Sequence, residues 1–146
     1  MPDVLNTPQV TLLVEDDEND ALLSLTALQS AGAFERVIHL TDGEAAIKYL
    51  NGDPPYTDRD SYPLPALILL DLKMPKLTGF EVLTWLQGQP RLAAEIPVIV
   101  LTGSIHPEDR KKAKELGAVG FEIKPVPFSQ LIEIAKKVSR TCYKLH

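Results

Sequence analysis

The chain has little of what several classes of protein require. Among its 146 residues there is one cysteine, Cys142, so neither an internal disulfide nor a two-cysteine redox site can form. Its longest apolar run, residues 66–70, is far shorter than the roughly 20 residues of a membrane-spanning helix. Its first residues lack the basic segment and long apolar stretch of a secretory signal. We therefore expect a cytoplasmic protein that does not enter a membrane.

An excess of positive charge is also absent. The chain has 15 Lys and Arg residues against 20 Asp and Glu residues, a net charge of −5. Non-specific DNA binding needs a basic surface that neutralises phosphates, so we expect no DNA partner. What the chain does have is the composition of a globular protein, with 45% hydrophobic and 24% charged residues. This length and composition predict a single domain with a buried core.

Short apolar segments alternate along the chain with longer segments of helical period. The predicted strands cover residues 11–14, 37–40, 66–70, 97–101 and 119–123. The predicted helices cover residues 18–31, 42–50, 78–87, 107–116 and 128–140. Such alternation predicts a parallel sheet with helices on both faces and right-handed crossovers.

The expected fold is therefore α/β, a doubly wound, flavodoxin-like (βα)5 arrangement of five parallel strands. We expect one domain over residues 1–146, with a core over about residues 10–138. No output domain is expected, since only six residues follow Arg140. Residues 51–65, which include four prolines, are predicted to form an exposed loop without assigned secondary structure.

Polar and charged side chains follow four of the predicted strands. Glu15 and Asp16 come after the first strand, Asp71 after the third, Thr102 after the fourth and Lys124 after the fifth. In a parallel sheet these carboxyl ends meet at one edge, where such folds bind their ligands. Solvent exposure of strand ends would account for one acidic residue there. It does not account for an acidic pair, an isolated Asp, a hydroxyl and a Lys from four strands.

This set of side chains suits phosphoryl transfer to a carboxylate. Asp71 would be the nucleophile, and the carboxylates of Glu15 and Asp16 would bind Mg²⁺, which prefers oxygen ligands. The metal offsets the repulsion between an anionic nucleophile and an anionic phosphate. Lys124 and Thr102 would contact phosphate oxygens. Three clustered carboxylates also repel one another without a cation, so a metal ion is indicated a second time.

Four short motifs, each at a predicted strand end, together resemble the receiver domain of two-component response regulators. They are Val-Glu-Asp-Asp at 14–17, Asp-Leu-Lys-Met-Pro at 71–75 with Gly79, Val-Leu-Thr-Gly at 100–103 and Lys-Pro at 124–125. The resemblance covers about residues 10–138. It implies that Asp71 accepts a phosphoryl group from a histidine kinase. It also implies that Asp16 binds the metal directly and that Glu15 is its partner, often acting through water.

The resemblance implies roles for three further groups. The backbone carbonyl of Lys73 would be the third protein ligand of Mg²⁺, Thr102 the switch hydroxyl and Phe121 the aromatic switch residue. Phosphorylation would change the surface formed by the helix over 107–116 and the last predicted strand and helix. Two copies could pair through that same surface. The chain would catalyse its own phosphorylation and dephosphorylation without turning over a separate substrate.

Finer details are similar to the single-domain regulators that include the cyanobacterial phytochrome response regulator. These details are the Val-Glu-Asp-Asp opening, the proline-rich insert before the third strand, residues 69–75 and the Lys-Pro-Val of residues 124–126. The similarity implies a phytochrome-type histidine kinase as partner. The signal would then pass by protein contact. A downstream protein, a homodimer and a phosphotransfer partner all remain open.

Other functions with a similar fold meet obstacles in the sequence. A phosphatase of the haloacid-dehalogenase type needs a second carboxylate two residues after its nucleophile, where this chain has Lys73. A flavin carrier needs a phosphate-binding loop after the first strand, where this chain has the acidic residues 15–18. The remaining alternative is a docking module with a receiver fold that acts without phosphorylation. The complete set of site residues argues against it.

Overall fold

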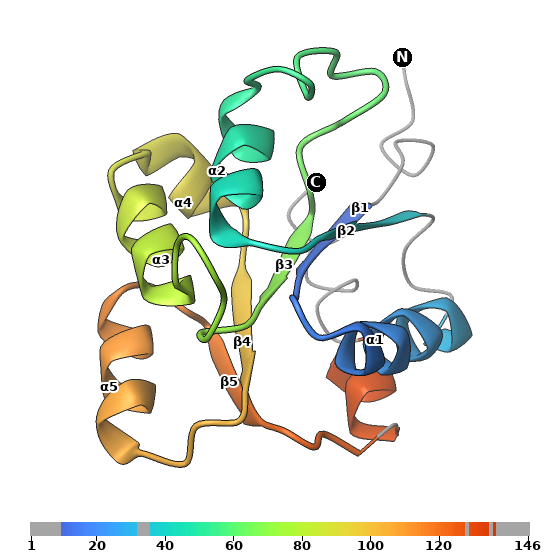
Figure 1. Cartoon of the computed structure of the whole chain (residues 1–146), viewed down its shortest axis with the longest axis vertical. Helices are drawn as coiled ribbons and strands as arrows, with labels where there is room; N and C mark the ends of the chain where they lie inside the picture. Colours follow the sequence, from blue (N-terminus) through green and yellow to red (C-terminus); the bar gives the residue numbers. More distant parts are fainter. Residues whose placement is uncertain (1–9, 32–35, 128, 135, 137–146) are drawn as a thin grey trace.

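The computed structural model describes residues 10–31, 36–127, 129–134 and 136, and places helices on both faces of a five-stranded parallel sheet (Figure 1). The strands are β1 (Val10–Val14), β2 (Arg36–Leu40), β3 (Leu67–Leu70), β4 (Val98–Thr102) and β5 (Gly120–Ile123). The helices are α1 (Glu18–Ala31), α2 (Gly43–Asn51), α3 (Gly79–Gln87), α4 (Pro90–Glu95) and α5 (Pro107–Glu115). The strand order β2-β1-β3-β4-β5 confirms the predicted flavodoxin-like fold.

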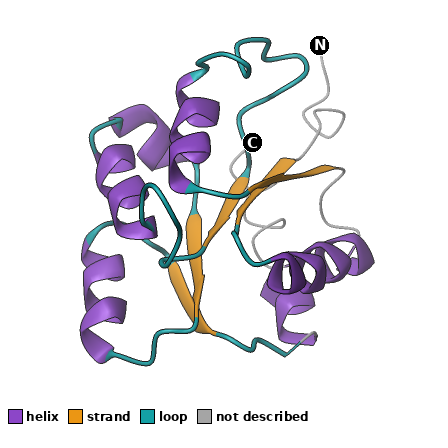
Figure 2. Cartoon of the chain, in the orientation of Figure 1, coloured by secondary structure: helices purple, strands orange, loops and turns teal. Residues whose placement is uncertain are grey.

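The helices form two layers around the sheet (Figure 2). One layer contains α2, α3, α4 and α5, and the other contains α1 and the helical residues 129–134. None of the helices in the described part of the chain is long and apolar enough to cross a bilayer.

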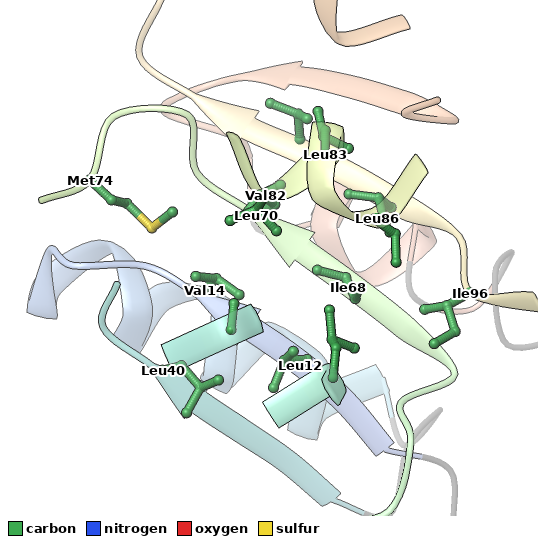
Figure 3. Packing of buried hydrophobic residues seen from close by; sticks show 14 of the residues in the cluster. Leu12, Val14, Leu40, Ile68, Leu70, Met74, Val82, Leu83, Leu86 and Ile96 are labelled. Atoms are coloured by element: carbon green, nitrogen blue, oxygen red, sulfur yellow. The ribbon is translucent and has the colours of Figure 1, made fainter. Parts of the chain in front are cut away.

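Each face of the sheet carries its own apolar core, because successive side chains of a strand point to opposite faces. Leu12 and Val14 of β1 pack in one cluster with Val82 and Leu83 of α3 (Figure 3). Leu13, which lies between them, belongs to the cluster on the α1 side. All residues of β1, β3 and β4 are buried, which explains why these strands are apolar without alternation.

The sheet positions the ends of β1 and β3 next to each other. Val14 lies opposite Leu40 of β2 on one side and opposite Leu70 of β3 on the other. The backbone N–H of Glu15 donates to Leu40 O at 2.9 Å, and that of Asp71 donates to Val14 O at 3.0 Å. The hydrogen-bond ladder thus continues one residue beyond the strands and holds Glu15 beside Asp71. The chain reverses its winding at this point, which is where ligands bind in such folds.

One helix was not expected from the sequence. The helix α4 has six residues, none of them buried, so it lacks the apolar period that would predict it. Its only sequence signal is Pro90 at its first turn. The helix predicted over 107–116 is therefore α5. Of the helix predicted over 128–140, residues 129–134 and 136 are helical; the other residues, and Cys142, lie outside the described residues.

The connection between α2 and β3 is irregular, as predicted, but it is ordered by specific contacts. The rings of Tyr49 and Tyr56, and those of Tyr56 and Tyr62, have centroids 5.2 Å apart in tilted and edge-on geometry. Arg59 donates hydrogen bonds to the carbonyl oxygens of Tyr49 at 2.9 Å and Tyr62 at 3.2 Å. These contacts tie the connection to the end of α2.

Candidate functional site

Three carboxylates meet at the carboxyl ends of β1 and β3. Glu15, Asp16 and Asp71 each offer an oxygen within 4.8 Å of the other two. Glu15 is 3% exposed and Asp71 is 6% exposed, whereas Asp16 faces solvent. Buried like charges at this distance need a cation, and carboxylate oxygens are the ligands that hard divalent ions prefer. The donor set therefore fits a divalent metal ion that enters from the Asp16 side.

The turn that follows β3 fixes the orientation of Asp71. The backbone N–H of Lys73 donates to Asp71 Oδ1 at 3.3 Å. The chain then folds back so closely that a Cβ atom at Gly79 would lie 2.4 Å from the backbone oxygen of Asp71. Only glycine permits this approach. The side chain of Lys73 is exposed, and a metal contact by its backbone carbonyl stays a prediction.

Lys124 reaches the acidic cluster from the end of β5. Its Nζ lies 3.4 Å from Asp71 Oδ2 and 3.1 Å from Asp20 Oδ2, and it also donates a hydrogen bond to Glu15 Oε1. The backbone N–H of Lys124 donates to Thr102 O at 2.7 Å, which aligns the ends of β4 and β5. The ammonium group therefore offsets part of the negative charge of the cluster.

Burial and neighbouring charges change the ionisation of two groups in this site. Burial raises the pKa of Glu15 from 4.5 to about 7; the hydrogen bond from Lys124 opposes this rise and the charge of Asp71 adds to it. Burial acts to lower the pKa of Lys124, but the hydrogen bonds to Glu15 and Asp20 and the charge of Asp71 outweigh it, so the pKa is raised. Lys124 is therefore a permanent ammonium, whereas Glu15 titrates near neutral pH.

The two predicted switch residues lie on neighbouring strands and on the same face of the sheet. Thr102 is fully buried, and its Oγ1 accepts a hydrogen bond from Ser104 N at 3.2 Å. Phe121 is half-buried, lies opposite Val100 and packs against the apolar cluster on the α3 side. Val100 and Thr102 share a face because they are two residues apart. Thr102 and Phe121 therefore border the same layer of side chains.

One contact of the site was not predicted from the sequence. Asp20, in the first turn of α1, contacts Lys124 although it is not a member of the carboxylate cluster. Its sequence signal is its place in the acidic first turn of the helix that follows Glu15 and Asp16. Asp17 caps α1: its Oδ1 accepts a hydrogen bond from Asp20 N at 2.9 Å.

Related sequences place these residues in a known family. The family model of the response regulator receiver domain matches residues 11–136. The probable methanogenesis regulatory protein FilR2 of Methanothrix harundinacea is 36% identical over 131 residues, which cover 90% of this chain and 81% of that protein. Response regulator Rcp1 of Synechocystis sp. is 40% identical over 116 residues, which cover 80% of this chain and 76% of Rcp1.

Solved structures with the same fold include regulators linked to phytochromes. The phosphorylated cyanobacterial phytochrome response regulator RcpA matches with a TM-score of 0.80 and 31% identity, over 96% of this chain and 97% of that chain. The Mn²⁺-bound form of Rcp1 matches with a TM-score of 0.76 and 34% identity, over 90% of this chain and 91% of that chain. The chain belongs to the response regulator receiver domains of two-component signalling.

Proposed function

We propose that this chain is a response regulator that accepts a phosphoryl group on Asp71 from the phosphohistidine of a histidine kinase, in a Mg²⁺-dependent reaction. One observation carries the proposal. The carboxylate of Asp71 lies within a cluster of three carboxylates, and the ammonium of Lys124 lies 3.4 Å from it. This arrangement combines an oxygen nucleophile, ligands for a divalent ion and a cation that can pair with a phosphoryl oxygen.

Each residue of the site has a distinct task in this reaction. An oxygen of Asp71 attacks the phosphorus atom, so an O–P bond forms, the N–P bond to the imidazole breaks and the imidazole leaves. Glu15, Asp16 and Asp71, with the backbone carbonyl of Lys73, would hold Mg²⁺, which offsets charge on the phosphoryl oxygens. Lys124 pairs with one phosphoryl oxygen, and the hydroxyl of Thr102 donates a hydrogen bond to another.

The phosphoryl group would act on the rest of the molecule through Thr102 and Phe121. It brings up to about two negative charges to Asp71. Thr102 moves toward the new oxygen acceptors and leaves space beside β4. Phe121 is half-buried, so it gains apolar burial when its ring turns into that space. The surface that changes is formed by α5, β5 and the helix that includes residues 129–134.

The same surface is the proposed place of output. It carries apolar side chains that face solvent, with Val119 68% exposed and Ile123 44% exposed. A homodimer, a downstream protein or a phosphotransfer partner would cover them. The similarity to the phytochrome response regulator RcpA supports a phytochrome-type histidine kinase as the partner on the input side.

The test is intact mass after incubation with acetyl phosphate and Mg²⁺. Wild type is expected to gain about 80 Da, the mass of one phosphoryl group, and to lose this gain in EDTA or in Asp71→Asn. Asp60→Asn, which removes an exposed carboxylate of the α2–β3 connection, is the matched control and is expected to gain the same mass as wild type. If wild type binds Mg²⁺ but gains no mass, the result favours the alternative hypothesis of a docking module that acts without phosphorylation.

A further inference from the structure

The ammonium of Lys124 is shared by carboxylates of two kinds. Glu15 and Asp71 belong to the cluster whose oxygens lie close enough together to hold a metal ion. Asp20 lies outside that cluster, on α1, yet its Oδ2 is 3.1 Å from Lys124 Nζ. We propose that Asp20 is a positioning residue, which holds Lys124 beside the site while a divalent cation occupies the cluster. The inference rests on the proposed metal-dependent function and extends it.

A metal ion and Lys124 compete for the same oxygens. Lys124 contacts both Glu15 and Asp71, and each of these carboxylates is a candidate metal ligand. A divalent cation would take up their lone pairs and would repel the ammonium as a like charge. Among the described residues, Asp20 is the one ion-pair partner of the Lys124 ammonium that lies outside the candidate metal ligands. The Asp20 carboxylate therefore remains available as an ion-pair partner that keeps the ammonium close to Asp71.

The backbone of Asp20 is held in place by a contact that does not involve Lys124. Its backbone N–H is held by Asp17 Oδ1 at 2.9 Å, at the start of α1. A cavity of about 40 Å³ is lined by Asp20, Lys124 and Leu101, and by none of the clustered carboxylates. This volume is enough for one water molecule. The ammonium can therefore shift toward α1 without displacing a packed side chain.

A general preference for acidic residues at the start of a helix does not account for this contact. Glu18 and Asp20 both lie in the first turn of α1, where negative charge is favourable. Asp20 is paired with Lys124, whereas Glu18 is exposed and has no ion pair within the described part of the chain. Glu18→Gln is therefore the control, because it removes the same charge from the same turn without touching Lys124.

The test is a double-mutant cycle on Mg²⁺ affinity, measured by isothermal titration calorimetry. Asp20→Asn is expected to weaken Mg²⁺ binding about three- to tenfold, because Lys124 then competes fully for Glu15 and Asp71. In a Lys124→Met background the same substitution is expected to change affinity less than about twofold. Glu18→Gln is expected to change it less than about twofold, and Asp20→Glu is expected to recover most of the affinity.

The outcomes separate the two proposals. An equal loss of affinity from Asp20→Asn with and without Lys124 would mean that Asp20 attracts the metal directly, and it would overturn the positioning role. Equal losses from Asp20→Asn and Glu18→Gln would overturn it too. If wild type binds Mg²⁺ and gains the phosphoryl mass while the cycle shows no coupling, the positioning role alone fails. If wild type binds no Mg²⁺, both proposals fail.

Discussion

Two basic side chains organise opposite edges of the sheet, and they do so with different partners. Arg59 belongs to the connection between α2 and β3, which leads into the amino end of β3 (Figure 1). Its guanidinium donates to the backbone oxygens of Tyr49, Leu50 and Tyr62, at 2.9, 2.9 and 3.2 Å. The planar guanidinium suits several fixed acceptors at once, and one of them is the carbonyl oxygen of Leu50 near the end of α2.

Lys124 lies at the carboxyl edge, and the partners of its side chain are carboxylates. They are Glu15, which directly follows β1, Asp20 of α1 and Asp71 in the turn after β3. Carboxylates can change their charge by protonation and can be phosphorylated, whereas backbone carbonyls do neither in water. The contacts of Arg59 therefore hold one structure, whereas the ammonium of Lys124 can exchange one carboxylate partner for another. A compact ammonium on a flexible stem suits such an exchange.

The largest effect is expected from removing the contacts of Arg59. Arg59→Met is expected to lower the free energy of unfolding by about 2–4 kcal/mol, because it removes the donor to the part-buried carbonyl oxygens of Leu50 and Tyr62. Mg²⁺ affinity should be unchanged. Urea unfolding measures the first quantity and calorimetric titration the second.

The matched control is Arg91→Met. The Arg91 side chain is 88% exposed and forms a surface pair with Glu95 at 3.7 Å, so its loss is expected to cost less than about 0.5 kcal/mol. If Arg59→Met lowers the free energy of unfolding as little as Arg91→Met does, the contacts of Arg59 do not stabilise the fold.

An intermediate effect is expected at the carboxyl edge, where Glu15 should make the free energy of unfolding depend on pH. The pKa of Glu15 is raised from 4.5 to about 7, so between these values the folded state binds more protons than the unfolded state. The free energy of unfolding should therefore fall as pH rises through this window. Glu15→Gln lacks this loss, so relative to wild type it should be more stable at pH 8 than at pH 5, by on the order of 2 kcal/mol.

Urea unfolding in EDTA at the two pH values measures this difference. Glu18→Gln is the control, because it removes an exposed carboxylate that lies outside the acidic cluster. A parallel pH dependence of wild type and Glu15→Gln would show that Glu15 ionises as freely in the folded chain as in the unfolded one.

The carboxyl edge was predictable to a degree that the other edge was not. Glu15, Asp71 and Lys124 each follow a strand directly and Thr102 ends one, and parallel strands must bring their ends together. The grouping of Tyr49 with Tyr56 and Tyr62 has no such rule, because it depends on the path of an irregular segment. The missed helix α4 is short and exposed, and propensity alone does not predict such helices. The pairing of Asp20 with Lys124 depends on where a long side chain reaches.

The smallest effect tests whether Mg²⁺ binding at the carboxyl edge is independent of the Arg59 contacts at the other edge. Mg²⁺ at ten times its dissociation constant should stabilise wild type by about 1.4 kcal/mol, since it binds the folded chain. This corresponds to a rise in Tm of about 4 °C for a domain of this size. The rise should disappear in Asp16→Asn, which removes the exposed ligand of the cluster, and should persist undiminished in Arg59→Met. A Tm that Mg²⁺ does not move in wild type would contradict the metal site. A rise that shrinks in Arg59→Met would mean that the α2–β3 connection supports the metal site from the opposite edge, and the two basic side chains would then belong to one coupled system.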